Sequence, residues 1–218
     1  MRWVWIGLAV VGVAAVGVVA YTEVTMASVE TPDYEVVERD GDFEVRQYPS
    51  MILASVTVDS TGADARGQGF RVLADFIFGN NRPSEKVAMT TPVVQEDSAK
   101  IAMTAPVEEV NSDITMTAPG GARGSTISFI MPAEFTIDTL PAPNNPDVSI
   151  QERAGERIAA VRFSGIASER DMAQKEVALR EWMKDQGLTA AGPPRYARYD
   201  PPWRVPFRRR NEVLIPVR

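Results

Sequence analysis

A strand followed by a single amphipathic helix is the pattern that most limits the folds open to this chain, and it occurs twice. In the first copy, residues 51–58 continue as a strand, and a helical stripe then recurs every three or four residues. The stripe consists of Phe70, Leu73, Ala74, Ile77 and Phe78. Ser60 or Thr61 is placed to cap this helix, and Gly79 to end it. The first unit is therefore predicted as strand then helix.

The second copy lies near the C-terminus. Residues 157–163 alternate as a strand, Ser168 offers an N-cap, and Asp171 supplies the acidic side chain of a capping box. The helical stripe that follows, before Gly187, consists of Met172, Leu179, Trp182, Met183 and Gln186. Superposing Gly79 on Gly187 aligns the two copies, which indicates a duplicated unit. The alternative is chance recurrence of common elements.

Most other segments read as short strands. Residues 34–49 alternate on both sides of Asp40-Gly41, a strong hairpin signal because glycine accepts the positive φ of such turns. Further strands are predicted at residues 86–94, 100–107 and 126–131, which are short and β-branched. The chain is therefore predicted to be α+β, with few helices covering one curved antiparallel sheet.

The chain of 218 residues contains no histidine and no cysteine. These two side chains carry most acid-base, nucleophilic and soft-metal chemistry at neutral pH. Their absence excludes a Ser-His-Asp triad, a Cys-His pair, a zinc finger, an iron-sulfur cluster and histidine-ligated haem. No disulfide can form either, so the fold must be stabilised by packing alone.

Residues 3–21 form 19 consecutive uncharged residues, long enough to span a bilayer core. We expect an uncleaved transmembrane anchor at 1–21, with Arg2 on the cytoplasmic side and the rest of the chain extracytoplasmic, or periplasmic. A cleaved signal, which would make the protein secreted, is the alternative, because Val18-x-Ala20 resembles a cleavage site. A buried globular helix is a third interpretation.

Residues 22–33 are polar and read as a linker, so the folded domain is expected at 34–218. A net charge of −6 and a pI near 4.9 argue against a nucleic-acid partner, since binding phosphates requires a dominant basic face. The partners expected are a small-molecule ligand and, through the N-terminal segment, a membrane.

A short methionine motif repeats as KVAMTTPV at 86–93, KIAMTAPV at 100–107 and TMTAP at 115–119. The simplest interpretation of Met89 and its equivalents is a methionine-lined core, because thioethers fill irregular gaps. The functional alternative is a soft apolar wall for a flat hydrophobic ligand, or in the extreme a thioether ligand to iron.

Arginines concentrate at the C-terminus, where residues 192–218 hold seven of them against Asp200 and Glu212. Guanidinium groups present paired donors, so this segment suits carboxylate or phosphate groups. Ion pairing with the surplus acids of the chain is the alternative for any single arginine. No catalytic constellation is visible, and no metal site is predicted, so we do not expect an enzyme.

Three motifs together resemble the SOUL, or haem-binding protein, family: KIAMTAPV at 100–107, FIMP at 129–132, and YDPPW with RRNEV at 199–203 and 209–213. The resemblance covers residues 34–217. It implies a duplicated β-α-β-β unit that forms a distorted antiparallel β-barrel with two main helices, similar to bacterial effector-binding domains. With the N-terminal segment, it suggests a bacterial, membrane-anchored member.

The family is associated with binding haem and other tetrapyrroles in an exposed apolar groove near the first helix, here residues 63–78. The resemblance implies that the macrocycle is contacted by Phe70, Leu73, Phe78 and Met89, with Trp203 nearby. Arg66, Arg71 and Arg204 are the residues expected to meet the propionates.

One departure matters: an axial histidine proposed for some members has no counterpart here. We therefore expect haem or a metal-free porphyrin as cofactor, held without a histidine axial ligand, with the protein acting as carrier, buffer or sensor. A non-haem small-molecule or protein interaction module of the same fold is the alternative. A third reading, an enzyme with a buried carboxylate of raised pKa in the groove, follows from hydrolase-like members of the wider superfamily.

Overall fold

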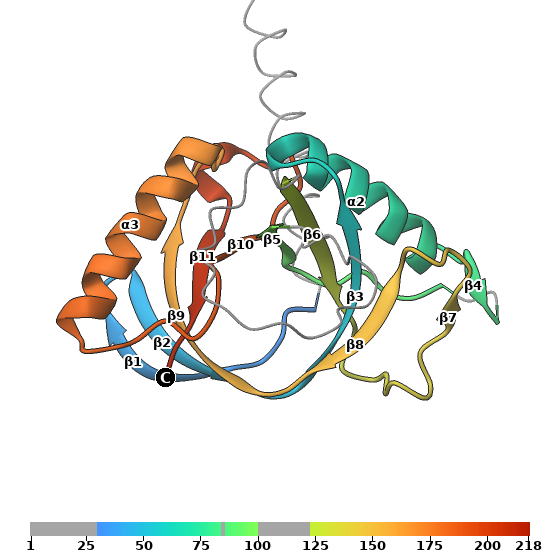
Figure 1. Ribbon diagram of the computed structural model, residues 1–218, viewed down its shortest axis with the longest axis horizontal. Coiled ribbons are helices and arrows are strands. Elements are labelled where there is room, and N and C mark those ends of the chain that lie inside the picture. The colour runs from blue at the N-terminus through green and yellow to red at the C-terminus, as the bar shows by residue number, and fades with distance from the viewer. Residues whose placement is uncertain (1–29, 84–85, 100–122) are drawn as a thin grey trace, which may run out of the picture.

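The computed structural model describes residues 30–83, 86–99 and 123–218, and its main feature is one nine-stranded antiparallel sheet (Figure 1). The strands of this sheet are β1 (Glu35–Asp40), β2 (Phe43–Tyr48), β3 (Met51–Val58), β5 (Val93–Ala99), β6 (Arg123–Ile130), β8 (Ser149–Arg153), β9 (Glu156–Phe163), β10 (Arg195–Arg198) and β11 (Asn211–Pro216). A small second sheet pairs β4 (Asn81–Arg82) with β7 (Ala142–Pro143). The helices are α2 (Gly62–Ile77), α3 (Glu169–Asp185) and the 3-10 turn η1 (Pro206–Arg208).

The order of strands supports the duplicated unit. The sheet runs β1-β2-β9-β11-β10-β5-β6-β3-β8. If β2, β3, β5 and β6 are exchanged with β8, β9, β10 and β11, the order from β2 to β8 reads the same from either end. Each unit thus has two strands, a helix and two more strands, and the β10–β5 pair lies at the middle of this order.

The sheet is curved but it is not the expected closed barrel. Its edges are β1 and β8, which pair with β2 and β3 respectively and not with each other within the described residues. Every residue of β1 is exposed, and four of its six side chains are charged. Charged side chains on an edge strand disfavour pairing with another strand, which is consistent with an open edge here.

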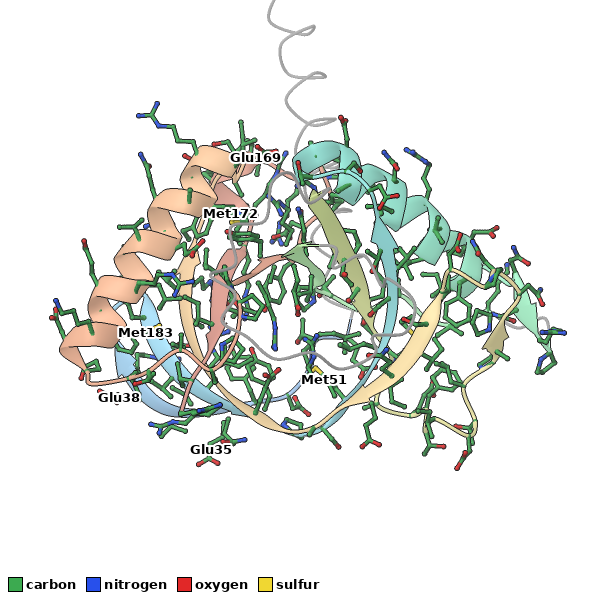
Figure 2. The ribbon with its side chains drawn as sticks, viewed as in Figure 1. Glu35, Glu38, Met51, Glu169, Met172 and Met183 are labelled. Atoms are coloured by element: carbon green, nitrogen blue, oxygen red, sulfur yellow. The ribbon has the colours of Figure 1, made fainter. Side chains whose placement is uncertain are left out.

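The helices lie on one face of the sheet, one on each half (Figure 1). Helix α2 packs on β3 and β6, and α3 packs on β9 and β11. Under α3, Met172 and Met183 belong to the core beneath the helix (Figure 2). Under α2, a Cβ at Gly69 would collide with Ile127 of β6, so the glycine lets helix and sheet approach closely.

Several local predictions are confirmed. The hairpin turns at Gly41, whose φ is +57°. Ser168 and Asp171 form the expected capping box of α3. Glycines with positive φ, Gly79 at 117° and Gly187 at 68°, follow the two helices. Thr61 is the N-cap residue of α2, but its side chain makes no capping hydrogen bond.

The strand expected at 86–94 is wrong, because β5 begins only at Val93. The preceding backbone bonds elsewhere: the Val87 N–H donates to the carbonyl of Ile77 at the end of α2, and the Thr91 N–H donates to that of Glu30. The predicted strand at 126–131 corresponds to β6, whereas the segment 100–107 lies outside the described residues.

The expected membrane anchor at 1–21 also lies outside the described residues, as does most of the 22–33 linker. Among the helices that the structure describes, none combines the length and apolar character needed to cross a bilayer.

Candidate functional site

Two loops meet at the end of the sheet where both helices begin (Figure 1). One joins β9 to α3, and the other, rich in proline, joins β10 to β11. The Gly165 N–H donates to the carbonyl of Pro206 over 2.9 Å, and the Asn211 side chain donates to the carbonyl of Gly165 over 3.1 Å. These bonds hold the two loops together, and we call the surface they form with the starts of α2 and α3 the arginine-rich end.

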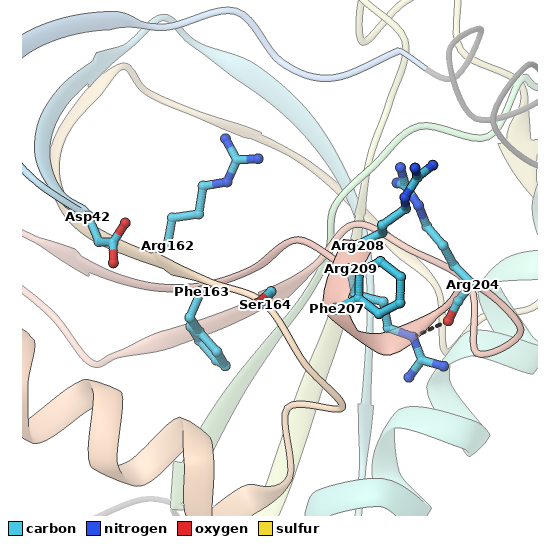
Figure 3. A pocket seen from close by; sticks show the side chains of 8 residues that line it. All are labelled: Asp42, Arg162, Phe163, Ser164, Arg204, Phe207, Arg208 and Arg209. Carbon is cyan, nitrogen blue, oxygen red and sulfur yellow. Dashed lines mark hydrogen bonds between the residues drawn. The ribbon is translucent and has the colours of Figure 1, made fainter.

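A hollow of about 550 Å³ opens at this end (Figure 3). Its lining consists of Asp42, Arg162, Phe163, Ser164, Arg204, Phe207, Arg208 and Arg209. Four arginines thus face one aspartate, on a protein whose net charge is −6. The size falls within the range of small-molecule sites, and the donor set suits a ligand with carboxylate or phosphate groups.

The loop orients these guanidinium groups through its own backbone. Arg204 forms an ion pair with Asp200, whose side chain is almost fully buried. The Arg209 Nε donates to the carbonyl of Arg204 over 2.7 Å. Part of the positive charge therefore positions the loop. Arg162 lies across the hollow from this loop (Figure 3), and it forms no ion pair in the described part of the chain.

A second pair of arginines lies between the two helices. Arg198 of β10 is opposite Val93 of β5, and opposed residues of antiparallel strands point to the same face. Because Val93 packs against the core under α2, Arg198 also emerges on the helix-covered face. Its guanidinium donates to the carbonyl of Ala167, at the start of α3, over 3.1 Å.

Electrostatics show that this pair is poorly neutralised. Burial and, to a smaller extent, the positive charge of Arg66 on α2 lower the pKa of Arg198 to about 10, although Glu169 opposes both effects. Burial also lowers the pKa of Arg66. The Glu169 carboxylate lies so close to Gly62 that a Cβ there would collide with it. Two partly buried cations thus share one nearby carboxylate.

The residues predicted for the site are only partly brought together. Arg66 lies beside Arg198, and Arg204 lines the hollow. Trp203 lies on the β10–β11 loop with 73% of its surface exposed. Phe70 is 37% exposed and its ring contacts that of Phe129 at 5.5 Å between centroids.

The other predicted residues lie elsewhere. Leu73 is fully buried in the core under α2, so the expectation that it faces a ligand is wrong. Met89 packs against the same core, as the simpler interpretation held. Phe78 follows the last residue of α2, twelve residues beyond Arg66 and so about 18 Å along the axis. Arg71 is exposed on α2.

Sequence reasoning missed Arg162, Phe163 and Ser164, at the end of β9, and gave no specific role to Phe207. Strand alternation in 157–163 had indicated that Arg162 and Phe163 point to opposite faces. Only the tertiary structure, however, places that strand end against the RRRNEV segment.

A different set of arginines pairs with a buried carboxylate on the sheet. Arg46 of β2 is 1% exposed and donates to both carboxylate oxygens of Glu212 on β11, at 2.7 and 3.0 Å. Glu212 also accepts from the Tyr199 hydroxyl at 2.7 Å and from the Arg210 Nε at 2.9 Å. Burial alone would raise the pKa of Glu212, but the hydrogen bonds and charges of these arginines outweigh it and lower the pKa.

The enzyme reading needed a buried carboxylate with a raised pKa. Glu212 is the fully buried carboxylate of the described residues, and its pKa is lowered. It therefore has the character of a structural ion-pair partner and not of a general acid.

Solved structures of other proteins share this fold. The C-terminal domain of EcmrR matches with a TM-score of 0.56 at 12% identity, covering 85% of this chain and 98% of that domain. A hydrolase from Listeria innocua matches with a TM-score of 0.52 at 12% identity, covering 84% of this chain and 94% of that one. At such identities the likeness concerns the fold alone.

Comparison of sequences identifies the family. The family model described as SOUL heme-binding protein matches residues 29–99 and 95–216, so the chain belongs to this family. Heme-binding protein 2 of Homo sapiens is 28% identical over 202 residues, which cover 90% of each protein. Heme-binding protein 1 of Mus musculus is 28% identical over 194 residues, which cover 86% of this chain and 93% of that protein.

Proposed function

We propose that this protein binds haem or a related tetrapyrrole at the arginine-rich end, as a carrier, buffer or sensor rather than as an enzyme. The observation that carries the proposal is the hollow, whose lining combines Arg162, Arg208 and Arg209 with Phe163 and Phe207. A tetrapyrrole of this class has a flat apolar ring and carboxylate side chains. Phenyl rings beside guanidinium groups offer a partner for each part.

The hollow fits the carboxylates better than the ring. Four arginines line it, whereas only Phe163 and Phe207 provide aromatic surface. Phe207 is 74% exposed, so a bound ring would remain partly open to solvent. The Arg66 and Arg198 pair supplies further positive charge at the same end, and binding an anion there would relieve the repulsion between these two side chains.

Iron is not expected to contribute a strong bond. The chain has no histidine or cysteine, and the lining of the hollow includes no methionine or tyrosine. Binding would then rest on ring contacts and carboxylate pairing, both of which a metal-free porphyrin provides equally well. We therefore expect haem and protoporphyrin to bind with similar affinity, and ferric haem to lack the spectrum of an imidazole-ligated six-coordinate iron.

The test is a titration of the full chain with ferric haem and with protoporphyrin IX, followed by porphyrin absorbance and tryptophan fluorescence. We expect saturable binding at micromolar concentrations. An R162Q/R208Q double variant should weaken both ligands by about tenfold or more, because each charge-assisted hydrogen bond contributes roughly 1.5–3 kcal/mol. Arg39→Gln is the matched control, since Arg39 lies on β1 and is 63% exposed.

Absence of saturable binding in the folded protein would reject the proposal. It would favour the alternative, a non-haem small-molecule or protein interaction module of the same fold. If the wild type and the double variant bind the porphyrins with equal affinity, the ligand does not bind in the hollow. The acidic net charge continues to argue against nucleic acid as the partner.

A further inference from the structure

The three most exposed large apolar side chains of the described residues are on the two loops of the arginine-rich end. Ile166, Trp203 and Phe207 are 70%, 73% and 74% exposed. Apolar residues on a loop are normally turned toward the protein, because exposing each of them to water costs free energy. Three together, on loops joined by the bond between Gly165 and Pro206, form an apolar tip at one end of the molecule.

Arginines surround this tip. Arg204 follows Trp203 and Arg208 and Arg209 follow Phe207 on the β10–β11 loop, whereas Arg162 lies at the end of β9, shortly before Ile166. Exposed acids lie away from this tip, because Glu35 and Glu38 are exposed on β1, far from the start of α3 (Figure 2). The apolar tip thus lies among several arginines.

We propose that this end docks on the surface of an anionic lipid bilayer. Trp203, Ile166 and Phe207 would enter the headgroup region, where tryptophan in particular is stabilised because its ring is apolar and its N–H remains hydrated. Arg162, Arg208 and Arg209 would contact the lipid phosphates. Exposed aromatic residues combined with cations at one edge match the chemistry of a bilayer surface in both respects.

The positive charge decides which partner fits best. A protein partner of the apolar tip alone would not require several arginines around it. An anionic bilayer supplies phosphate groups at high density in one plane, and this density suits several guanidinium groups that lie on adjacent loops. The apolar run of residues 3–21, which we expect to span a membrane, would keep the domain within reach of such a surface.

The absence of cysteine makes a direct test possible, because a single introduced cysteine can be labelled without background. Ile166→Cys and Trp203→Cys would each carry a polarity-sensitive fluorophore in the full chain. Ile137→Cys and Val177→Cys, at residues 50% and 58% exposed elsewhere on the domain, are the matched controls. Each protein is reconstituted into vesicles of phosphatidylcholine, with or without 30% phosphatidylglycerol, and circular dichroism checks its fold.

We expect the labels at 166 and 203, but not those at 137 and 177, to shift to the blue and to be quenched by brominated lipids in the anionic vesicles. An added R208E/R209E change, or high salt, should reverse the effect, because both weaken attraction to anionic lipid. Quenching at 166 and 203 no greater than at the control positions would overturn the proposal. Because these readouts do not involve a porphyrin, the proposal and the tetrapyrrole function can fail separately.

Discussion

The interior and the arginine-rich end use the same side chain under opposite electrostatic conditions. Arg46, inside the sheet, is paired with Glu212 through two hydrogen bonds, and its guanidinium lies 4.4 Å from the centre of the Tyr34 ring. Burial alone would lower the pKa of Arg46, but its contacts with Glu212 and Tyr48 raise it overall. The pKa of Arg198 is instead lowered to about 10, first by burial and then by Arg66. A buried arginine that is fully paired stabilises the fold, whereas one that is poorly neutralised is suited to an external anion.

The largest effect is expected from Glu212→Gln. This change removes the negative charge from a site that is 0% exposed and leaves Glu44, which contacts only the Arg46 Nε, as the ionic partner of the Arg46 guanidinium. Breaking a buried pair in this way costs about 3–5 kcal/mol, so the free energy of unfolding in urea should fall by that amount. Glu181→Gln, on the exposed face of α3, serves as control. A loss below about 1 kcal/mol would mean that the interior pair is as weakly coupled as a surface one.

An effect of intermediate size is expected from pH. Burial raises the pKa of Tyr48 from 10.0 to about 12, although Arg46 opposes the rise. The folded protein then holds this proton more tightly than the unfolded chain, so stability should decrease as pH rises from 10 to 12, by up to about 2.7 kcal/mol. Unfolding curves in urea at pH 9, 10 and 11 measure the decrease, and Tyr48→Phe should reduce it. An unchanged slope in that variant would contradict the assignment to Tyr48.

The same interior predicts acid lability. The pKa of Glu212 is lowered in the folded protein, so its contribution to stability is present above its ordinary pKa of 4.5 and is lost as pH falls further below this value. Urea unfolding at pH 6, 4 and 3 should show this loss in the wild type and a smaller one in Glu212→Gln. If the free energy of unfolding falls equally in the two proteins, other carboxylates cause the loss of stability at acid pH.

The smallest effect on stability is expected from Arg198→Met, and this change should stabilise the protein, unlike the changes above. Removing a partly buried, repelled cation should raise the free energy of unfolding by about 1–2 kcal/mol, after the lost hydrogen bond to Ala167 is allowed for. The same variant should bind porphyrin more weakly, so the comparison requires both measurements. Destabilisation together with unchanged porphyrin affinity would place Arg198 with the structural arginines.

Much of the fold could be predicted from local patterns, because its elements follow short-range rules. The hairpin at Gly41 and the capping box at Ser168 depend on residues within four positions of each other. The strand expected at 86–94 was wrong because that backbone is bonded to Glu30 and to the end of α2, which no local pattern reports.

The site was less predictable for the same reason. A helical stripe indicates which residues lie on one side of α2, but it does not distinguish the edge of the stripe from its centre. Leu73 is therefore in the core, while Phe70 and Phe78, at the margins, are exposed. Arg162 and Arg208 are 46 positions apart in the chain, and only the pairing of β9 with β11 brings them to one hollow.

By itself, the sequence determined the α+β class, the two units of strand and helix, the family, and the exclusion of histidine and cysteine chemistry, because each of these depends on composition or on contiguous motifs. The tertiary structure alone decided that the sheet stays open and which arginines are neutralised. The physical reason is that the charge state and exposure of a guanidinium depend on neighbours distant in sequence: Glu212 lies opposite Arg46 across the sheet, whereas Arg198 has Arg66 as its neighbour.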